Sequence, residues 1–234
     1  MRVFRDRRDA GRYLARKLSA YAGQPGLLVL ALPRGGVPVG YEVATALGAE
    51  LDVFLVRKLG VPGHRELAMG AIASDGVRVL NENVLQAMHI SEDVIESVTA
   101  AEQEVLRQRE NAYRGDRPRP DVRDRTVILV DDGLATGATM RAAATAVRKQ
   151  GPQRLVIAVP VAPPETCEQL AVEADDIICA VTPEAFLGVG MWYEDFSQTT
   201  DDEVRALLAR RRAEWIRENA GSETEHSPDR PAGT

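Results

Sequence analysis

The chain has 234 residues, of which 44% are hydrophobic, so it can bury one sizeable core and carry one small appendage. Its formal net charge of −6 argues against a general nucleic-acid binder, because affinity for a phosphate backbone comes from clustered Lys and Arg. It starts without an apolar signal core and no stretch approaches the ~20 apolar residues of a membrane span, so we expect a cytoplasmic protein with no membrane partner.

The predicted elements begin with a helix that Asp6 caps and that ends near Tyr21 and Gly23. Five apolar runs predict buried strands, at residues 27–32, 51–56, 126–130, 155–159 and 177–181. Helical spacing predicts helices at residues 37–47, 81–88, 91–114, from 139 onward, 164–172 and 201–218. This alternation indicates an α/β fold with a doubly wound, mostly parallel sheet.

The remaining segments complete a single domain, expected over residues 1–218. Residues 57–66 are interpreted as an irregular loop, and residues 68–73 and 77–80 as a hairpin. We expect a helical insert at about 81–114, a small hood subdomain at about 182–200 and a disordered tail at 219–234, which has almost no apolar residue. Cys167 and Cys179 lack CxxC spacing and lie in apolar segments, so they are interpreted as reduced core residues.

The stretch from Thr126 to Met140 joins an apolar strand, two adjacent carboxylates and a turn of small residues. Backbone N–H groups at a helix N-terminus are unpaired, and Gly137 with its small neighbours lets a phosphate approach them. Two carboxylates would repel a bare phosphate, so we expect Asp131 and Asp132 to face sugar hydroxyls or Mg²⁺. A ribose 5-phosphate would satisfy both halves, whereas the plain alternative is a strand end with solvated acids.

This stretch resembles the phosphoribosyl-pyrophosphate (PRPP) binding motif of the type I phosphoribosyltransferases, in which two acidic residues after an apolar strand precede a loop ending in Thr-Gly-x-Thr. Other nucleotide motifs fit less well, since the chain has no P-loop and no G-x-G-x-x-G. The resemblance implies that Asp131 and Asp132 bind the ribose hydroxyls, and Mg²⁺ through water. It also implies that the 5-phosphate lies on a loop made of Ala135, Thr136, Gly137, Ala138 and Thr139.

A second glycine loop, Leu32-Pro33-Arg34-Gly35-Gly36, follows the first core strand, at the sheet edge where open α/β folds bind ligands. Two glycines let main-chain amides converge on an anion, and an arginine can pair with it bidentately. An ordinary Gly-rich turn would contain the same residues. Beside the acidic motif, the loop resembles the pyrophosphate loop of the family, which implies that Arg34, Gly35 and Gly36 hold the diphosphate.

Residues 57–66 combine two glycines, a proline and several basic groups, as expected for a loop that closes over a polyanion. A mobile solvated connection is the alternative. The segment resembles the flexible catalytic loop of the family, which assigns Arg57 and Lys58 to PRPP binding. The predicted catalytic set is Lys58, Asp131, Asp132 and, as candidate proton acceptor, Glu66.

Residues 182–196 interleave aromatic residues with glycines, a pattern that can stack on a planar base and read its edge, although core packing explains the same aromatics. The stretch resembles the base-binding hood of purine phosphoribosyltransferases, which implies base contacts from Phe186, Gly190, Trp192 and Tyr193. Two family residues are replaced: the hood lysine by Ala185, and the aspartate of hypoxanthine-type members by Ala135. Hypoxanthine and guanine are therefore not expected as acceptors.

The resemblance covers residues 27–196 and implies a Mg²⁺-dependent pentosyltransferase. Such an enzyme moves the 5-phosphoribosyl group of PRPP to a nitrogen acceptor, here a nucleobase in nucleotide salvage, and releases pyrophosphate. A non-catalytic PRPP or nucleotide sensor on the same fold is the alternative, and a phosphosugar hydrolase is a third reading. The identity of the acceptor and association into a homodimer are left open by the sequence.

Overall fold

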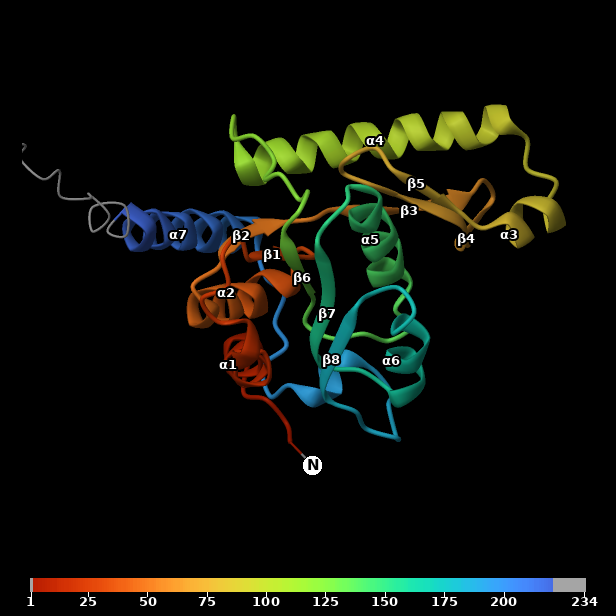
Figure 1. Cartoon of the computed structure of the whole chain (residues 1–234). Helices are drawn as coiled ribbons and strands as arrows, with labels where there is room; N and C mark the ends of the chain where they lie inside the picture. The colour runs from red at the N-terminus through yellow and green to blue at the C-terminus, as the bar shows by residue number, and fades with distance from the viewer. Residues whose placement is uncertain (1, 221–234) are drawn as a thin grey trace, which may run out of the picture.

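Five apolar segments form the central sheet in the computed structural model of the chain, which describes residues 2–220 apart from the side chains of residues 65 and 66 (Figure 1). Every neighbouring pair of these strands is parallel. Their spatial order is β2 (Glu50–Val53), β1 (Leu28–Ala31), β6 (Thr126–Val130), β7 (Arg154–Val161) and β8 (Asp176–Val181). The predicted doubly wound α/β fold is confirmed, since helices cover both faces of this sheet.

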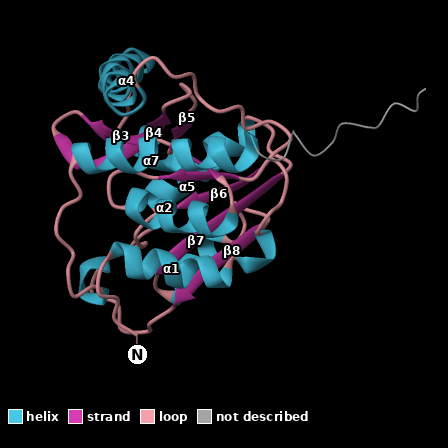
Figure 2. Cartoon of the chain, turned by 90° about the vertical axis from the view of Figure 1, so that its left-hand side faces the viewer, coloured by secondary structure: helices cyan, strands magenta, loops and turns pink. Residues whose placement is uncertain are grey.

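Successive side chains of each strand enter two different cores, because they point to opposite faces of the sheet. In β6, for example, Ile128 packs under one layer of helices and Leu129 under the other. The first layer contains α1 (Arg7–Lys17), α2 (Gly36–Leu47) and α7 (Asp201–Ala220), which lie together in front of the sheet in Figure 2. The second layer contains α5 (Ala138–Lys149) and α6 (Pro164–Leu170).

The chain leaves the parallel sheet after β2 and builds a second, antiparallel sheet. Its strands lie in the order β3 (Val56–Val61), β4 (His64–Ala73) and β5 (Arg78–Leu80). Two helices follow, α3 (Glu82–Ala87) and α4 (Glu92–Arg114). Figure 1 shows this sheet and α3 as an arm that extends beside α5, with α4 running along its top.

The expectations for the arm are partly confirmed. The predicted hairpin over residues 68–80 is present, because β4 pairs with β5. The irregular loop expected at residues 57–66 is wrong, since most of it lies in the hairpin of β3 and β4. Gly63 lies in the turn between these two strands, and its φ of 80° is one that glycine adopts without strain in a tight turn. The strand expected to end at Val56 ends three residues earlier, at Val53, where the parallel sheet stops.

A buried charge cluster fixes the C-terminal end of α4 to the end of β2. Arg114 Nε donates to both carboxylate oxygens of Asp52 at 3.0 Å, and its Nη1 donates to Glu110 at 2.6 Å. Glu110 also forms an ion pair with Arg119. Burial raises the pKa of Asp52, and the Arg114 charge opposes that rise. Loss of one partner would leave a buried charge unpaired, which costs about 3–5 kcal/mol, so this end of α4 is firmly held.

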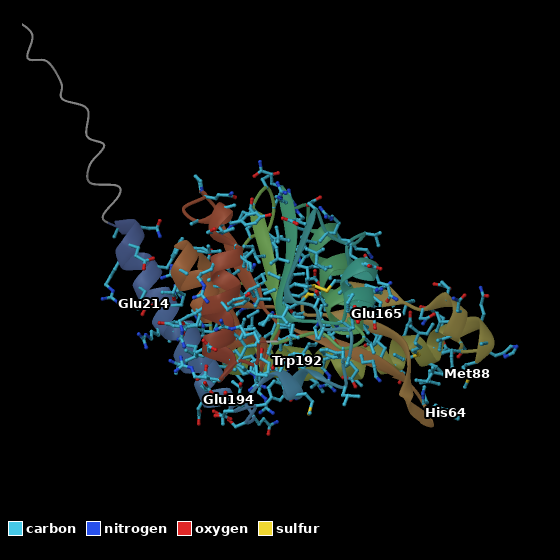
Figure 3. All side chains as sticks on the ribbon, turned by 90° about the horizontal axis from the view of Figure 1, so that it is seen from below. His64, Met88, Glu165, Trp192, Glu194 and Glu214 are labelled. Carbon is cyan, nitrogen blue, oxygen red and sulfur yellow. A yellow bond between two sulfur atoms is a disulfide. The ribbon has the colours of Figure 1, made fainter. Side chains whose placement is uncertain are left out.

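The cysteine prediction is wrong. Cys167 and Cys179 form a disulfide that ties α6 to β8, and their Cα atoms are 6.6 Å apart. Figure 3 shows the bond in yellow beside the labelled Glu165. The prediction failed because it used spacing along the chain, whereas α6 folds back against β8 and brings together residues that are 12 apart in sequence.

The C-terminal helix α7 continues to Ala220, slightly past the domain end expected at residue 218. The rest of the expected tail, residues 221–234, lies outside the described residues. None of the helices in the described part of the chain combines the length and the apolar character needed to cross a bilayer.

Candidate functional site

Two adjacent carboxylates follow β6 at the carboxyl edge of the parallel sheet, as expected for a ligand site in this fold. The Asp132 N–H donates to Asp131 Oδ1 at 2.8 Å, which orients the first carboxyl. Arg7 Nε donates to Asp132 Oδ2 at 2.7 Å. Burial raises the pKa of Asp131 well above its usual value, and the neighbouring Asp132 charge adds to the rise. Burial also raises the pKa of Asp132, whereas Arg7 lowers it.

The second glycine loop packs directly against these acids, because β1 lies next to β6 in the sheet. A β-carbon at Gly35 would lie 2.0 Å from Asp132 Oδ2, and one at Gly36 would lie 2.8 Å from the Val130 carbonyl oxygen. Both positions therefore need glycine for the two loops to meet. The Pro33–Arg34 peptide bond between β1 and Gly35 is cis.

The loop after the acids and the first turn of α5 together present four exposed small residues: Ala135 and Thr136 in the loop, and Ala138 and Thr139 in the helix. Gly137 between them is buried and has a φ of 69°, which only glycine adopts at little cost. The hydroxyl of Thr166 in α6 donates to the Ala135 carbonyl at 2.7 Å. This loop is thus held from behind by α6 and open in front, a form that can receive an anion on unpaired N–H groups.

Arg57 and Lys58 are neighbours in β3, so their side chains face opposite sides of the antiparallel sheet. Lys58 lines a pocket of about 500 Å³ that Thr136 and Thr139, after the acid pair, also line. Arg57 faces α4, where it forms an ion pair with Glu102. The two basic residues therefore approach the candidate site from different sides of the arm.

Most of the chain matches a known protein family. Residues 6–191 match the phosphoribosyl transferase domain family. The chain belongs to this family. The match includes both glycine loops, the acid pair and the first half of the hood, and it ends one residue before Trp192.

Two curated relatives and one solved structure are similar over most of this chain. Proteins of Mycobacterium tuberculosis strains CDC 1551 / Oshkosh and ATCC 25618 / H37Rv, each called a "Putative phosphoribosyl transferase", are 46% identical over 210 residues, 90% of this chain and 47% of theirs. The chain therefore spans about half the length of these curated relatives. The crystal structure of TT1426 from Thermus thermophilus is 46% identical, covers 90% of this chain and 99% of that one, and has a TM-score of 0.79.

The hood residues of this chain contact the protein itself. Tyr193 is 6% exposed, and its hydroxyl donates to the Asp132 carbonyl oxygen. Phe186 and Trp192 pack against the small core that contains Tyr193. A β-carbon at Gly190 would lie 2.9 Å from the ring of Phe196. The base-binding role of these residues stays a prediction.

One polar atom in the hood has no hydrogen-bond partner among the described residues. Trp192 Nε1 is buried, and no acceptor for it exists among the described residues. In Figure 3 Trp192 lies near the middle of the molecule, whereas His64 and Met88 mark the far end of the arm. The hood and the tip of the arm are therefore separate parts of this family member.

Sequence reasoning missed Arg7 of α1, which connects the acid pair to the hood. Besides Asp132, its guanidinium donates from Nη1 to the Ser197 carbonyl at 2.6 Å and lies 4.0 Å from the Phe196 ring centroid. The N-terminal segment is held there, since the Phe4 N–H donates to the Trp192 carbonyl at 2.8 Å. The predicted Asp6 cap, confirmed by its 2.7 Å bond from the Asp9 N–H, places Arg7 at the start of α1 but does not reveal its partner.

The structure brings most of the predicted site residues to one edge of the fold. The acid pair contacts Gly35, Gly36 and Tyr193, and Lys58 faces Thr136 and Thr139 across the large pocket. The proton acceptor proposed at Glu66 lies in β4, but its side chain is outside the described residues.

Proposed function

We propose that this chain transfers the 5-phosphoribosyl group of PRPP to a nitrogen acceptor and releases pyrophosphate. The observation that carries the proposal is the meeting of three features: the acid pair, the Gly35–Gly36 loop packed against it, and the open loop that leads into α5. Each feature suits a different part of PRPP. Together they would bind a sugar that carries one phosphate and one diphosphate.

The roles follow from the chemistry of each group. The N–H groups of residues 135–139, the proposed phosphate loop, would bind the 5-phosphate, and Asp131 and Asp132 would accept hydrogen bonds from the ribose hydroxyls. Arg34 and Lys58 would bind the diphosphate from the two sides of the site. The acceptor nitrogen would use its lone pair to form a bond to C1 of the ribose, while the C1–O bond breaks and its electron pair leaves with pyrophosphate.

Little covalent chemistry is required of the protein in such a displacement. Positioning of the acceptor against C1 and stabilisation of developing charge supply the acceleration. The two carboxylates lie beside the ribose in this arrangement, where they would stabilise the positive charge that develops as the bond to the diphosphate lengthens. Glu66 remains the candidate proton acceptor.

The residues fit Mg²⁺ as a partner of the substrate. Asp131 and Asp132 offer adjacent carboxylate oxygens, which are ligands that Mg²⁺ prefers. In proteins Mg²⁺ usually keeps several water ligands and also binds substrate phosphates. Burial raises the pKa of both carboxyl groups although Arg7 already pairs with Asp132, so a further cation nearby would favour the charged form of both. When bound, Mg²⁺ would neutralise charge on the diphosphate.

The acceptor is proposed to be a nucleobase other than a 6-oxopurine, or another ring or amine nitrogen. Ala135 and Ala185 are both exposed, and neither methyl side chain can donate to a base carbonyl or move a proton. Nucleotide salvage and a cytoplasmic location stay predictions.

Two observations favour the alternative, a PRPP or nucleotide sensor without turnover. Asp132 is already paired with Arg7, and Tyr193 is already buried in packing. For catalysis, Asp132 would have to bind the ribose while it stays paired with Arg7 or after it leaves Arg7. Tyr193 would have to contact the acceptor from its buried position or move out of it.

One experiment separates the readings. Pyrophosphate release is measured with PRPP and Mg²⁺, with and without each member of a panel of nucleobases, and PRPP affinity is measured by calorimetry in parallel. Release only with an acceptor is the expected result. Binding of PRPP without release on any acceptor would identify a sensor, and release without an acceptor would identify a hydrolase. No binding of PRPP would refute the proposal.

A further inference from the structure

The helical insert carries a row of side chains toward the second glycine loop, residues 32–36, which is the proposed diphosphate loop. Glu102, Leu106, Arg109 and Tyr113 recur every three or four residues of α4, so they share one face of the helix. Leu106 and Tyr113 are buried, which shows that this face packs against the rest of the domain. The insert lies outside the segments in which the sequence pattern located the site.

Both ends of this row hold a basic residue that already belongs to the candidate site. At one end Glu102 forms an ion pair with Arg57 of β3. At the other end the Tyr113 hydroxyl donates to Asp201 Oδ1 at 2.6 Å, and Arg34 Nη1 lies 3.7 Å from the same oxygen. The insert therefore contacts Arg57 directly, and it contacts Arg34 through Asp201.

Arg109 lies between these two ends and is exposed. It lines a cavity of about 30 Å³ together with Pro33 of the diphosphate loop, Arg57, and Thr139 of the phosphate loop. Among the side chains that the structure describes, no carboxylate forms an ion pair with Arg109. Arg107, two residues earlier in the helix, is different, because it donates two hydrogen bonds to Glu104 at 2.7 and 2.8 Å.

The electrostatic surroundings of Tyr113 agree with this placement. Burial and the hydrogen bond to Asp201 raise the pKa of the Tyr113 hydroxyl to about 12, and the positive charges of Arg109 and Arg34 act against the rise. Both guanidinium groups are therefore near enough to act on this hydroxyl.

We propose that Arg109 is a binding residue for the diphosphate of PRPP and for released pyrophosphate, acting with Arg34 and Arg57. This inference rests on the proposed function. A cavity of about 30 Å³ holds roughly one water molecule, so it cannot hold a diphosphate. It marks the gap where Arg57, Arg109 and the two loops converge and where one phosphate oxygen can enter.

Charge balance explains why the third arginine matters. Arg34 and Arg57 each have a carboxylate partner already, so an arriving anion must compete with Asp201 and Glu102 for them. Arg109 needs no such exchange, and its planar guanidinium can bind phosphate oxygens bidentately. Its contribution should therefore be specific to ligands that carry a diphosphate.

The test compares Arg109→Gln with Arg107→Gln. Both variants remove one positive charge from an exposed side chain of α4, and the two positions are two residues apart. Calorimetry with Mg²⁺ measures binding of inorganic pyrophosphate, PRPP and ribose 5-phosphate. Arg109→Gln is expected to weaken pyrophosphate and PRPP at least about tenfold, the effect of losing one hydrogen bond between charged groups, and to leave ribose 5-phosphate within about twofold. Arg107→Gln should bind all three as wild type does, and Arg109→Lys should recover part of the loss.

Wild-type affinity of Arg109→Gln for pyrophosphate and PRPP would overturn the inference. An equal loss for ribose 5-phosphate would also overturn it, because it would indicate a general disturbance of the site. A wild-type protein that binds PRPP but transfers nothing would refute the proposed reaction, while the affinities of the variants would still decide the role of Arg109. A wild-type protein that binds none of the three ligands would refute both.

Discussion

Gly137 is the position where one added side chain should most disturb the phosphate loop. Its φ of 69° lies in the left-handed region that favours glycine. A β-carbon there would lie 2.9 Å from Leu170 Cδ1 and 3.0 Å from Thr166 Cγ2, both in α6. Gly137→Val therefore strains the backbone and also pushes the loop away from the helix that supports it.

The two effects can be sized separately. A left-handed backbone costs a residue with a β-carbon roughly 1–2 kcal/mol, and overpacking a well-packed contact costs about 1–3 kcal/mol. We expect the free energy of unfolding of Gly137→Val to fall by about 2–5 kcal/mol. We also expect the Kd for PRPP to rise at least about tenfold, equivalent to about 1.4 kcal/mol, because displaced N–H groups no longer meet the phosphate.

Gly151 provides the matched control. It follows the other end of α5 and has a φ of 75°, but a β-carbon there would meet no atom within 4 Å. Gly151→Val should therefore lose about 1–2 kcal/mol of stability and keep its affinity for PRPP. Urea unfolding gives the stabilities, and calorimetry at a temperature where both variants are folded gives the affinities. Equal PRPP affinity of the two variants would show that this loop is not the phosphate site.

Three other perturbations test the site from different directions. Asp131→Asn should lose about 1–3 kcal/mol of PRPP binding in calorimetry, through weaker bonds to the ribose. The same variant, without ligand, should have a higher Tm than wild type at about pH 7. Burial raises the pKa of Asp131 in the folded state, so this carboxyl destabilises the fold as the pH rises above about 4. Profiles of Tm against pH that run parallel for wild type and variant would contradict this. Reduction of the Cys167–Cys179 bond should lower the free energy of unfolding by about 3 kcal/mol, as estimated for a closed loop of this size, and Cys179→Ser should show the same loss with no response to reductant. Hypoxanthine and guanine should show kcat/KM values ~10⁴ below the best acceptor in a steady-state panel, and efficient turnover of either would mean that another donor replaces the hood lysine.

The parallel sheet and the two glycine loops could be predicted because local signals agree there. The strand expected at Thr126–Val130 has the same bounds in the structure, since an apolar run followed by acids and glycine leaves few other conformations. Gly35 and Gly36 follow a strand in the same way, and the sheet order then brings them to the acids. In these segments the residues that form the element also form the candidate site.

The arm was harder to predict because its strand β3 has a different neighbour on each side. Leu59 and Val61 are buried, but the charged pair Arg57 and Lys58 between Val56 and Leu59 hides the alternation. Arg57 is charged because it meets α4, and Lys58 because it faces the pocket. A strand that needs polar side chains on both faces has the composition of a loop.

Contacts between distant segments could not be predicted at all. Arg7 and Asp132 are 125 residues apart, and Arg57 and Glu102 are 45 apart. An ion pair leaves no periodic signal in a chain that is 27% charged. Only the packing of α1 and α4 against the sheets selects these pairs from the many that composition allows.

The bond from Arg7 to Ser197 also fixes when the site can be completed. The two residues are 190 positions apart, and at synthesis rates of about 5–20 residues per second roughly 10–40 s separate their appearance. The β1 and β6 edge, with its two carboxylates, emerges well before the segment that anchors the arginine. On a growing chain the acid pair is thus among the last features to reach its final surroundings, and ligand-binding competence should arise only when translation has passed the hood.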